Sequence, residues 1–299
     1  MLASSFILMK ILGRIALLVY KGLAKIPYSV LMSIGTFALN IIFPFHLFPF
    51  QRVTRRNLRA AFPSYTKIIL SEIEYNYYKN ALDFSIELLE SFSCKKSKLS
   101  VNFLNMDVLQ KAFEATDFVV CYCGHFLNYE VLTCLPAQYP EYEMYCYYQP
   151  SGLKEIDEYV ERARSRYGAH LIPTTSPLRK LLELKKNNDD RKARRKYLIG
   201  SLADLKPVNN QITSISFLNQ YMYIYNGTEK IGTRLNASFL YADISCHSKN
   251  VFDVEFKQLD SHSPKSSLTD QYFLFLQDNI KRQPEIWMLW GTERFIEST

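Results

Sequence analysis

DFVVCYCGHFLNYEVLTCLP, residues 117–136, is the stretch of sequence from which the fold can be read. Its first part, 117–123, is a short apolar run rich in β-formers, and Gly124 ends that run. We expect a helix to follow and to stop before Pro136. His125 is therefore expected at a strand-to-helix turn, which is where open α/β sheets place their binding sites.

The alternation of strands and helices continues along the chain. Residues 72–92 have apolar positions three and four apart, which predicts a helix that packs on a core. The further strand candidates are 143–148, 196–202, 237–244, 251–257 and 286–290. The further helix candidates are 126–135, 154–167, 176–186, 226–236 and 268–283. This order predicts an α/β fold with a single sheet flanked by helices.

The net charge of +7 is located at one end of the 299-residue chain, because the first acidic residue is Glu72. The basic residues before it are Lys10, Arg14, Lys21, Lys25, Arg52, Arg55, Arg56, Arg59 and Lys67. This excess flanks apolar runs instead of forming a nucleic-acid-binding motif. We therefore expect an anionic membrane as partner and no nucleic acid.

The N-terminal segment is expected to hold the chain at a membrane. No residue in 26–51 is charged, and at about 1.5 Å per residue this run could cross a hydrocarbon core of about 30 Å. Pro44 and Pro49 predict that its second half breaks into an interfacial piece, and 5–20 forms another apolar stretch. The alternative is a buried amphipathic hairpin in a soluble protein.

A cleaved signal peptide is disfavoured, because no small-residue cleavage site follows the apolar run. The expected organisation is a membrane anchor of interfacial helices over 1–51 and an α/β domain over 52–299. The basic residues just after the anchor place this domain on the cytoplasmic face of the cell inner membrane.

The six cysteines form no C-x-x-C unit and have no histidine at metal-ligand spacing, so no metal site is expected. Cys121 and Cys123 lie in the apolar run and are interpreted as small buried side chains in a reducing compartment. A thiol hydrolase that uses either of them with His125 is the alternative. The charged run KKNNDDRKARRK at 185–196 is interpreted as a solvated loop or helix end, or as a docking surface for an acidic carrier protein.

His125 is the histidine that has a carboxylate placed to serve it. The spacing in GHFLNYE would let Glu130 reach back from the first helical turn to one imidazole nitrogen. The other nitrogen could then accept a proton from a substrate hydroxyl, which is general-base catalysis without an enzyme nucleophile. The alternative for a lone histidine beside apolar residues is a structural role.

At these motifs the chain resembles the lysophospholipid acyltransferase superfamily, and more closely its branch of late lauroyl- and myristoyl-type acyltransferases of lipid A biosynthesis. The matching blocks are RRNLRAAFP at 55–63, GHFLNYE at 124–130, SLADLKP at 201–207, FLNQ at 217–220, NGTEKIGTRLNASFLYADI at 226–244 and PEIWMLWGTERF at 284–295. They occur in the family's order, so the resemblance covers roughly residues 50–295.

The resemblance implies a glycerolipid acyltransferase-like fold and transfer of a fatty acyl chain from acyl carrier protein, or less readily coenzyme A, to a hydroxyl of a membrane glycolipid. It implies no metal or redox cofactor. His125 would be the base, Glu130 its orienting partner, and Asp204 would position the acceptor. Gly227 and Glu229 would line the next part of the substrate site or form a loop and helix cap.

The chain also departs from the family pattern. Gln149 stands where the family often has Arg, Leu205 where it has Gln, and Thr292 and Glu293 where it has His and Arg. The missing arginine contact to an oxyanion or phosphate could come from Arg164 or Arg166, which lie close together in the sequence. These departures leave two alternatives, an acyltransferase for another glycerophospholipid or an aminolipid, and a non-catalytic membrane homologue.

Overall fold

A computed structural model gives the fold. It describes residues 25–48, 50–92, 99–127, 129–151, 154–207, 213–248 and 250–295, with Val19, Gly22 and Leu23. The apolar stretch expected over 5–20 therefore lies outside the described residues, apart from Val19.

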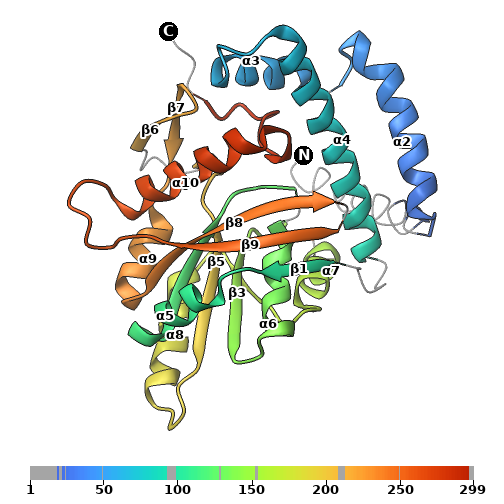
Figure 1. Cartoon of the computed structure of the whole chain (residues 1–299). Coiled ribbons are helices and arrows are strands. Elements are labelled where there is room, and N and C mark those ends of the chain that lie inside the picture. The colour runs from blue at the N-terminus through green and yellow to red at the C-terminus, as the bar shows by residue number, and fades with distance from the viewer. Residues whose placement is uncertain are drawn as a thin grey trace, which may run out of the picture.

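A mainly parallel seven-stranded sheet forms the centre of the protein (Figure 1). Its strands are β1 (Ser100–Phe103), β2 (Phe118–Cys123), β3 (Tyr142–Tyr148), β4 (His170–Pro173), β5 (Lys196–Leu202), β8 (Ser238–Ser248) and β9 (Val251–Gln258). They lie in the order β1-β9-β8-β2-β5-β3-β4, and β8 with β9 is the antiparallel pair. The predicted α/β class is confirmed. A separate hairpin pairs β6 (Thr213–Phe217) with β7 (Gln220–Ile224).

Helices cover both faces of this sheet. Among the described residues the α-helices are α2 (Tyr28–Ile42), α3 (Gln51–Ala61), α4 (Lys67–Phe92), α5 (Met106–Ala115), α6 (Leu135–Gln138), α7 (Lys154–Ser165), α8 (Pro177–Asp189), α9 (Gly227–Leu235) and α10 (Leu268–Arg282). Short 3₁₀ helices are η1 (Phe43–Phe45), η2 (Tyr129–Cys134) and η3 (Pro284–Ile286).

Strand β2 shows why a continuous apolar run forms a central strand here. All six of its residues are buried. Successive side chains of a strand point to opposite faces, so Val120 and Tyr122 join one hydrophobic core while Cys121 and Cys123 join the other. The run therefore fixes the sheet between two layers of helices.

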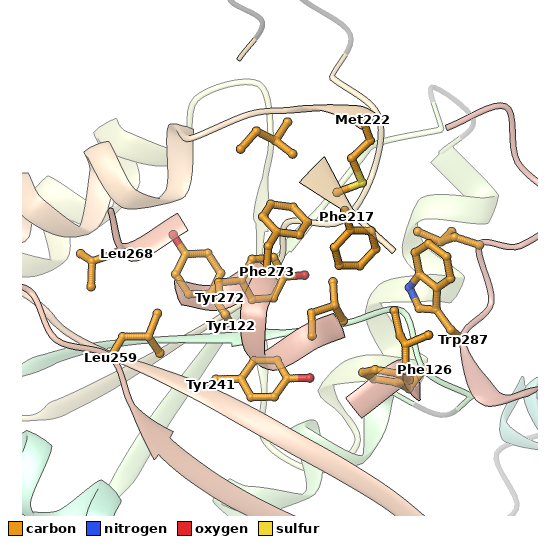
Figure 2. Close-up of a cluster of buried hydrophobic side chains, with 14 of the residues drawn as sticks. Tyr122, Phe126, Phe217, Met222, Tyr241, Leu259, Leu268, Tyr272, Phe273 and Trp287 are labelled. Atoms are coloured by element: carbon orange, nitrogen blue, oxygen red, sulfur yellow. The ribbon is translucent and has the colours of Figure 1, made fainter. Parts of the chain in front are cut away.

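Many of the aromatic side chains fill the core on the α10 side of the sheet. Figure 2 shows Tyr122, Tyr241, Tyr272 and Phe273 gathered there, with Trp287 at one end of the group. Tyr122 stacks on Tyr272 with ring centroids 4.8 Å apart. The high aromatic content is thus explained in large part by core packing.

Two expected elements differ from the structure. The helix expected over 126–135 is instead η2 followed by α6, and Pro136 lies in the first turn of α6, where its missing N–H costs nothing. The prediction of a strand over 286–290 was wrong. This segment follows η3 and forms an isolated bridge between Phe126 and Trp287. Its backbone groups are hydrogen-bonded to the loop around His125 and not to a described strand of the sheet.

Helix α2 lies beside α4 (Figure 1). Its exposed face carries an apolar stripe. The exposed side chains of the stripe are Val30, Ile34, Phe37 and Ile41, whose spacing of three and four residues puts them on one helix face. On its inner face Gly35 allows close packing against Leu82. The run Tyr28–Phe45 is long and apolar enough to cross a membrane, and α2 gives way to η1 next to Pro44 as expected.

Candidate active site

The centre of the candidate site is a buried pair formed by His125 and Asp204. The carboxylate of Asp204 lies 2.5 Å from Nδ1 of His125 through Oδ1, and its Oδ2 accepts the backbone N–H of His125 at 2.9 Å. The side chain of Asp204 is fully buried, whereas that of His125 is 14% exposed. The pair has the geometry of an oriented general base.

The sheet register brings these two residues together. Strands β2 and β5 are parallel neighbours, and Cys123 lies opposite Leu202 at their carboxyl ends. His125 and Asp204 each follow two residues later, so they leave the same edge of the sheet side by side.

A C-terminal segment holds this pair from the other side. The backbone N–H of Met288 donates to the carbonyl of His125 at 2.8 Å, and Leu127 donates to Ile286 at 2.9 Å. The indole Nε1 of Trp287 donates to Oδ2 of Asp204 at 3.0 Å. Trp287 and the backbone pairing therefore fix the loop that carries His125.

The carboxylate of Asp204 is kept ionised in spite of its burial. Burial alone raises the pKa of Asp204, but attraction to His125, the hydrogen bonds from His125 and the charge of Arg294 outweigh it and lower that pKa to about 2. Asp204 accepts three N–H groups in all. The structure thus pairs Asp204 with His125, and the expected role of Asp204 in positioning the acceptor stays a prediction.

Glu130 has a different neighbour from the one expected. Its Oε1 accepts Nε of Arg164 at 2.7 Å, so the carboxylate of Glu130 pairs with α7. The contact to Nδ1 of His125 that the sequence suggested for Glu130 belongs to Asp204. The physical reason is that 129–134 forms a 3₁₀ helix, which does not continue as the α-helix on which the sequence argument relied.

A pocket with a mainly apolar lining lies next to the Glu130–Arg164 ion pair. It encloses about 420 Å³, including its opening, between the ends of β2, β3 and β5. Cys123, Met144, Cys146 and Gly200 form part of its wall. The wall includes Cys123, two residues before His125, whereas neither His125 nor Asp204 lines the pocket.

The cysteine alternative finds no support in the geometry. Cys121 and Cys123 are almost completely buried, and burial raises the pKa of both thiols. A thiol of this kind stays protonated and is a poor nucleophile.

The other expected site residues make contacts of their own in the structure. The guanidinium of Arg166 lies over the ring of Tyr167, 4.7 Å from its centroid. Glu229 accepts the backbone N–H of Thr269 at 2.9 Å, in the first turn of α10. Gly227 begins α9, and a side chain there would collide with the ring of Tyr225. These contacts of Glu229 and Gly227 match the loop-and-cap interpretation.

Sequence reasoning missed Trp287 and Arg294 as parts of this site. Arg294 is 2% exposed, and its Nε and Nη2 have no hydrogen-bond partner among the described residues. A buried guanidinium so placed acts through its charge, here on Asp204. The closing block of the resemblance contained both residues and was the available signal.

Helix α3 supports this C-terminal segment. The side-chain amide of Asn57 donates to the carbonyls of Trp290 and Thr292, at 2.9 and 3.1 Å. Glu293, which departs from the family pattern, forms an ion pair with Arg56 of α3. The departure at Glu293 therefore has a structural partner on α3.

A family model described as "Bacterial lipid A biosynthesis acyltransferase" matches residues 5–295. The chain belongs to this family. Membership identifies it as an acyltransferase of the lipid A biosynthesis family, and it confirms the resemblance in the sequence blocks. No curated protein matches the chain. The candidate site lies at the edge of the sheet where β2 and β5 end.

Replacing Arg294 by methionine should lower activity without lowering stability. The variant removes N–H groups that are buried without partners, each costing about 1–3 kcal/mol, so the melting temperature should stay level or rise. It also removes the charge that favours ionised Asp204, so acyl transfer should fall about tenfold, or about 1.4 kcal/mol. Arg282→Met, which loses a half-exposed partner of Asp243, is the control. Loss of folding in Arg294→Met would instead show that Arg294 is required for stability.

Proposed function

We propose that this protein transfers a fatty acyl chain from an acyl carrier protein thioester to a hydroxyl of a membrane glycolipid in lipid A biosynthesis. The observation that carries the proposal is the His125–Asp204 pair in a member of this family. A mainly apolar pocket whose wall includes Cys123, two residues before His125, supports it. The reaction requires a base for the hydroxyl and space for the acyl chain, and no metal or redox cofactor enters it.

In the proposed mechanism Asp204 holds the proton of His125 on Nδ1, so that Nε2 presents its lone pair. Nε2 takes the proton of the acceptor hydroxyl while the hydroxyl oxygen attacks the thioester carbonyl. The C–S bond of the tetrahedral intermediate then breaks, and the imidazolium returns the proton to the leaving thiolate. Asp204 stabilises the imidazolium throughout.

We further propose that Glu130 and Arg164 serve the donor. Arg164 lies at the mouth of the apolar pocket, where its guanidinium could stabilise the oxyanion that develops from the thioester carbonyl. Glu130 would then be a positioning residue that holds Arg164. Asp204 takes the orienting role for His125 that the sequence suggested for Glu130.

We propose that α2 lies in the plane of the bilayer at the cytoplasmic face of the inner membrane. The apolar stripe of α2 faces outward, while its other side contacts α4 through the Tyr28–Asp83 hydrogen bond. Helix α4 also carries Lys79 and Glu87, and charged side chains are costly inside hydrocarbon. If α2 lies in the membrane interface, its apolar stripe contacts lipid and its other face contacts α4, while α4 stays outside the hydrocarbon.

Gly200 of β5 should set the length of the acyl chain. A Cβ at this position would meet Cε of Met144 at 3.1 Å and Sγ of Cys146 at 3.3 Å, so a larger side chain fills the pocket. Gly200→Val should shift preference toward shorter donors by about tenfold or more, since each methylene is worth about 1–3 kcal/mol. Competition between donors of different length, read by mass spectrometry, measures this shift. Gly200→Ala should shift it less. If folded Gly200→Val keeps the wild-type preference for donor length, the acyl chain binds elsewhere.

The carrier-docking hypothesis for 185–196 needs a narrower test than charge reversal of the whole run. Arg194 pairs with Asp117 and Arg195 with Glu143, so both are tied to the body of the protein. Arg191→Glu with Lys192→Glu should raise KM for the acyl carrier protein donor about tenfold and leave coenzyme A donors unchanged. Arg179→Glu with Lys180→Glu, on α8 before this run, is the control. An equal effect on both donors would remove this surface as a carrier site.

Reconstituted transfer tests the whole proposal. Purified protein is given acyl carrier protein or coenzyme A thioesters, together with a lipid A precursor or a glycerophospholipid as acceptor. Product is expected with the carrier thioester and the lipid A precursor. Acylation of the glycerophospholipid alone would identify the other acceptor class, and no transfer by folded, membrane-bound protein would support the non-catalytic homologue.

A further inference from the structure

A second pocket, distinct from the one lined by Glu130 and Arg164, opens between α3, α4 and the turn that follows η1. It encloses about 560 Å³, including its open mouth. The polar part of its lining consists of His46, Arg55, Arg59, Lys67, Ser71 and Glu74. None of these residues lines the pocket beside Glu130 and Arg164.

The charge of this basic pocket favours an anion. It contains three cations and one carboxylate, a net charge of +2 when His46 is neutral. Nε of Arg55 donates to Oε2 of Glu74 at 2.7 Å, and its Nη1 lies 2.8 Å from Nε2 of His46. Arg59 and Lys67 are exposed, and neither forms an ion pair with another described residue. Two cations are therefore available to a phosphate.

Glu74 indicates that the ligand also carries a hydrogen-bond donor. Its side chain is 2% exposed, and its Oε1 has no hydrogen-bond partner among the described residues. Buried polar atoms are normally satisfied by protein, water or ligand. A ligand with both a phosphate and a hydroxyl would meet the two cations and Oε1 of Glu74 together.

The surroundings of the pocket indicate a lipid as the source of that phosphate. Phe45, Leu47 and Phe50 flank it along the chain with exposed fractions of 70%, 70% and 68%, and Ile68 next to Lys67 is 80% exposed. Phe45, Leu47 and Phe50 lie in the segment that leads from α2 to α3, and Ile68 lies at the start of α4. Exposed apolar groups beside cations are typical of a surface that enters a membrane interface.

We propose that this basic pocket binds the headgroup of an anionic phosphoglycerol lipid, with its phosphate on Arg59 and Lys67 and a glycerol hydroxyl donating to Oε1 of Glu74. The bound lipid would fix α3 at the bilayer surface. Because Asn57 of α3 holds the C-terminal segment behind Asp204, the site would orient the active centre toward the membrane. The headgroup site does not depend on the proposed reaction.

Binding is tested on the full chain in neutral detergent with short-chain phosphatidylglycerol as the probe. Saturable binding is followed by thermal shift and by native mass spectrometry. Phosphatidylcholine should bind weakly. Phosphatidylmethanol, which has the same charge but lacks the glycerol hydroxyls, should bind more weakly than phosphatidylglycerol. Equal binding of these two anionic lipids would contradict the role of Glu74. Equal stabilisation by inorganic phosphate would show a simple anion site and not a lipid site.

The cations are tested with a matched pair of double variants. Arg59→Gln with Lys67→Gln should weaken phosphatidylglycerol binding about tenfold or more, because each cation near a membrane surface contributes about fivefold in affinity. Arg52→Gln with Lys79→Gln removes the same charge from α3 and α4 outside the pocket and should bind like wild type. Equal losses in both double variants would show diffuse attraction. Unchanged lipid binding with weaker use of acyl carrier protein would identify a protein-docking surface instead.

Discussion

Replacing His125 by alanine should lower acyl transfer by at least about 100-fold, because a general base typically contributes about 10²–10⁴. The protein should remain folded, since the ring keeps part of its exposure and its removal leaves the sheet intact. The measurement is turnover of a carrier-bound acyl chain at saturating acceptor, with circular dichroism as the folding check.

The surface pair of His247 and Asp253 offers a matched control. Nε2 of His247 lies 2.7 Å from Oδ2 of Asp253, so this is also a histidine–aspartate pair, but it is exposed on β8 and β9. His247→Ala should leave turnover unchanged. Wild-type turnover in His125→Ala, or loss of turnover in His247→Ala or His170→Ala, would refute the proposed mechanism.

Replacing Asp204 by asparagine should lower turnover by about 10²–10⁴ as well, and by more than Glu130→Gln. Asp204 accepts three N–H groups, and an asparagine amide would turn a donor toward one of these donors. The imidazole of His125 could relieve that clash by moving its proton to Nε2, which would abolish the base. Asp253→Asn is the control that should have no effect.

Asp204 should also contribute to stability in a pH-dependent way. Its pKa of about 2 in the folded state lies below the ordinary value of 3.8, so the stabilisation is present above about pH 4 and is lost as pH falls toward 2. The difference corresponds to about 2 kcal/mol. Urea denaturation should show this loss in wild type between those pH values, and Asp204→Asn should lack the pH-dependent part.

Double-mutant cycles separate the two acidic residues. If Asp204 serves His125 and Glu130 serves Arg164, Asp204→Asn should be strongly non-additive with His125→Ala. Glu130→Gln should be non-additive with Arg164→Gln instead. Coupling of Glu130 with His125, and not with Arg164, would restore the assignment suggested by sequence spacing.

The sequence by itself determined the features that depend on neighbouring residues. The apolar run before Gly124, the strand candidates 196–202 and 251–257, and the helix that became α4 all follow local periodicity. It also located the positive charge and the apolar N-terminal segment. Short elements with weak patterns escaped prediction, including β1 and β4 of four residues each and the β6–β7 hairpin.

Tertiary structure alone decided which carboxylate serves His125. Glu130 is five residues away in the sequence, yet the 3₁₀ turn directs it to Arg164. Asp204 is 79 residues away and meets His125 because β2 and β5 are paired in parallel register. Local spacing carries no information on which strands become neighbours, since that choice depends on how two cores pack against the sheet at once.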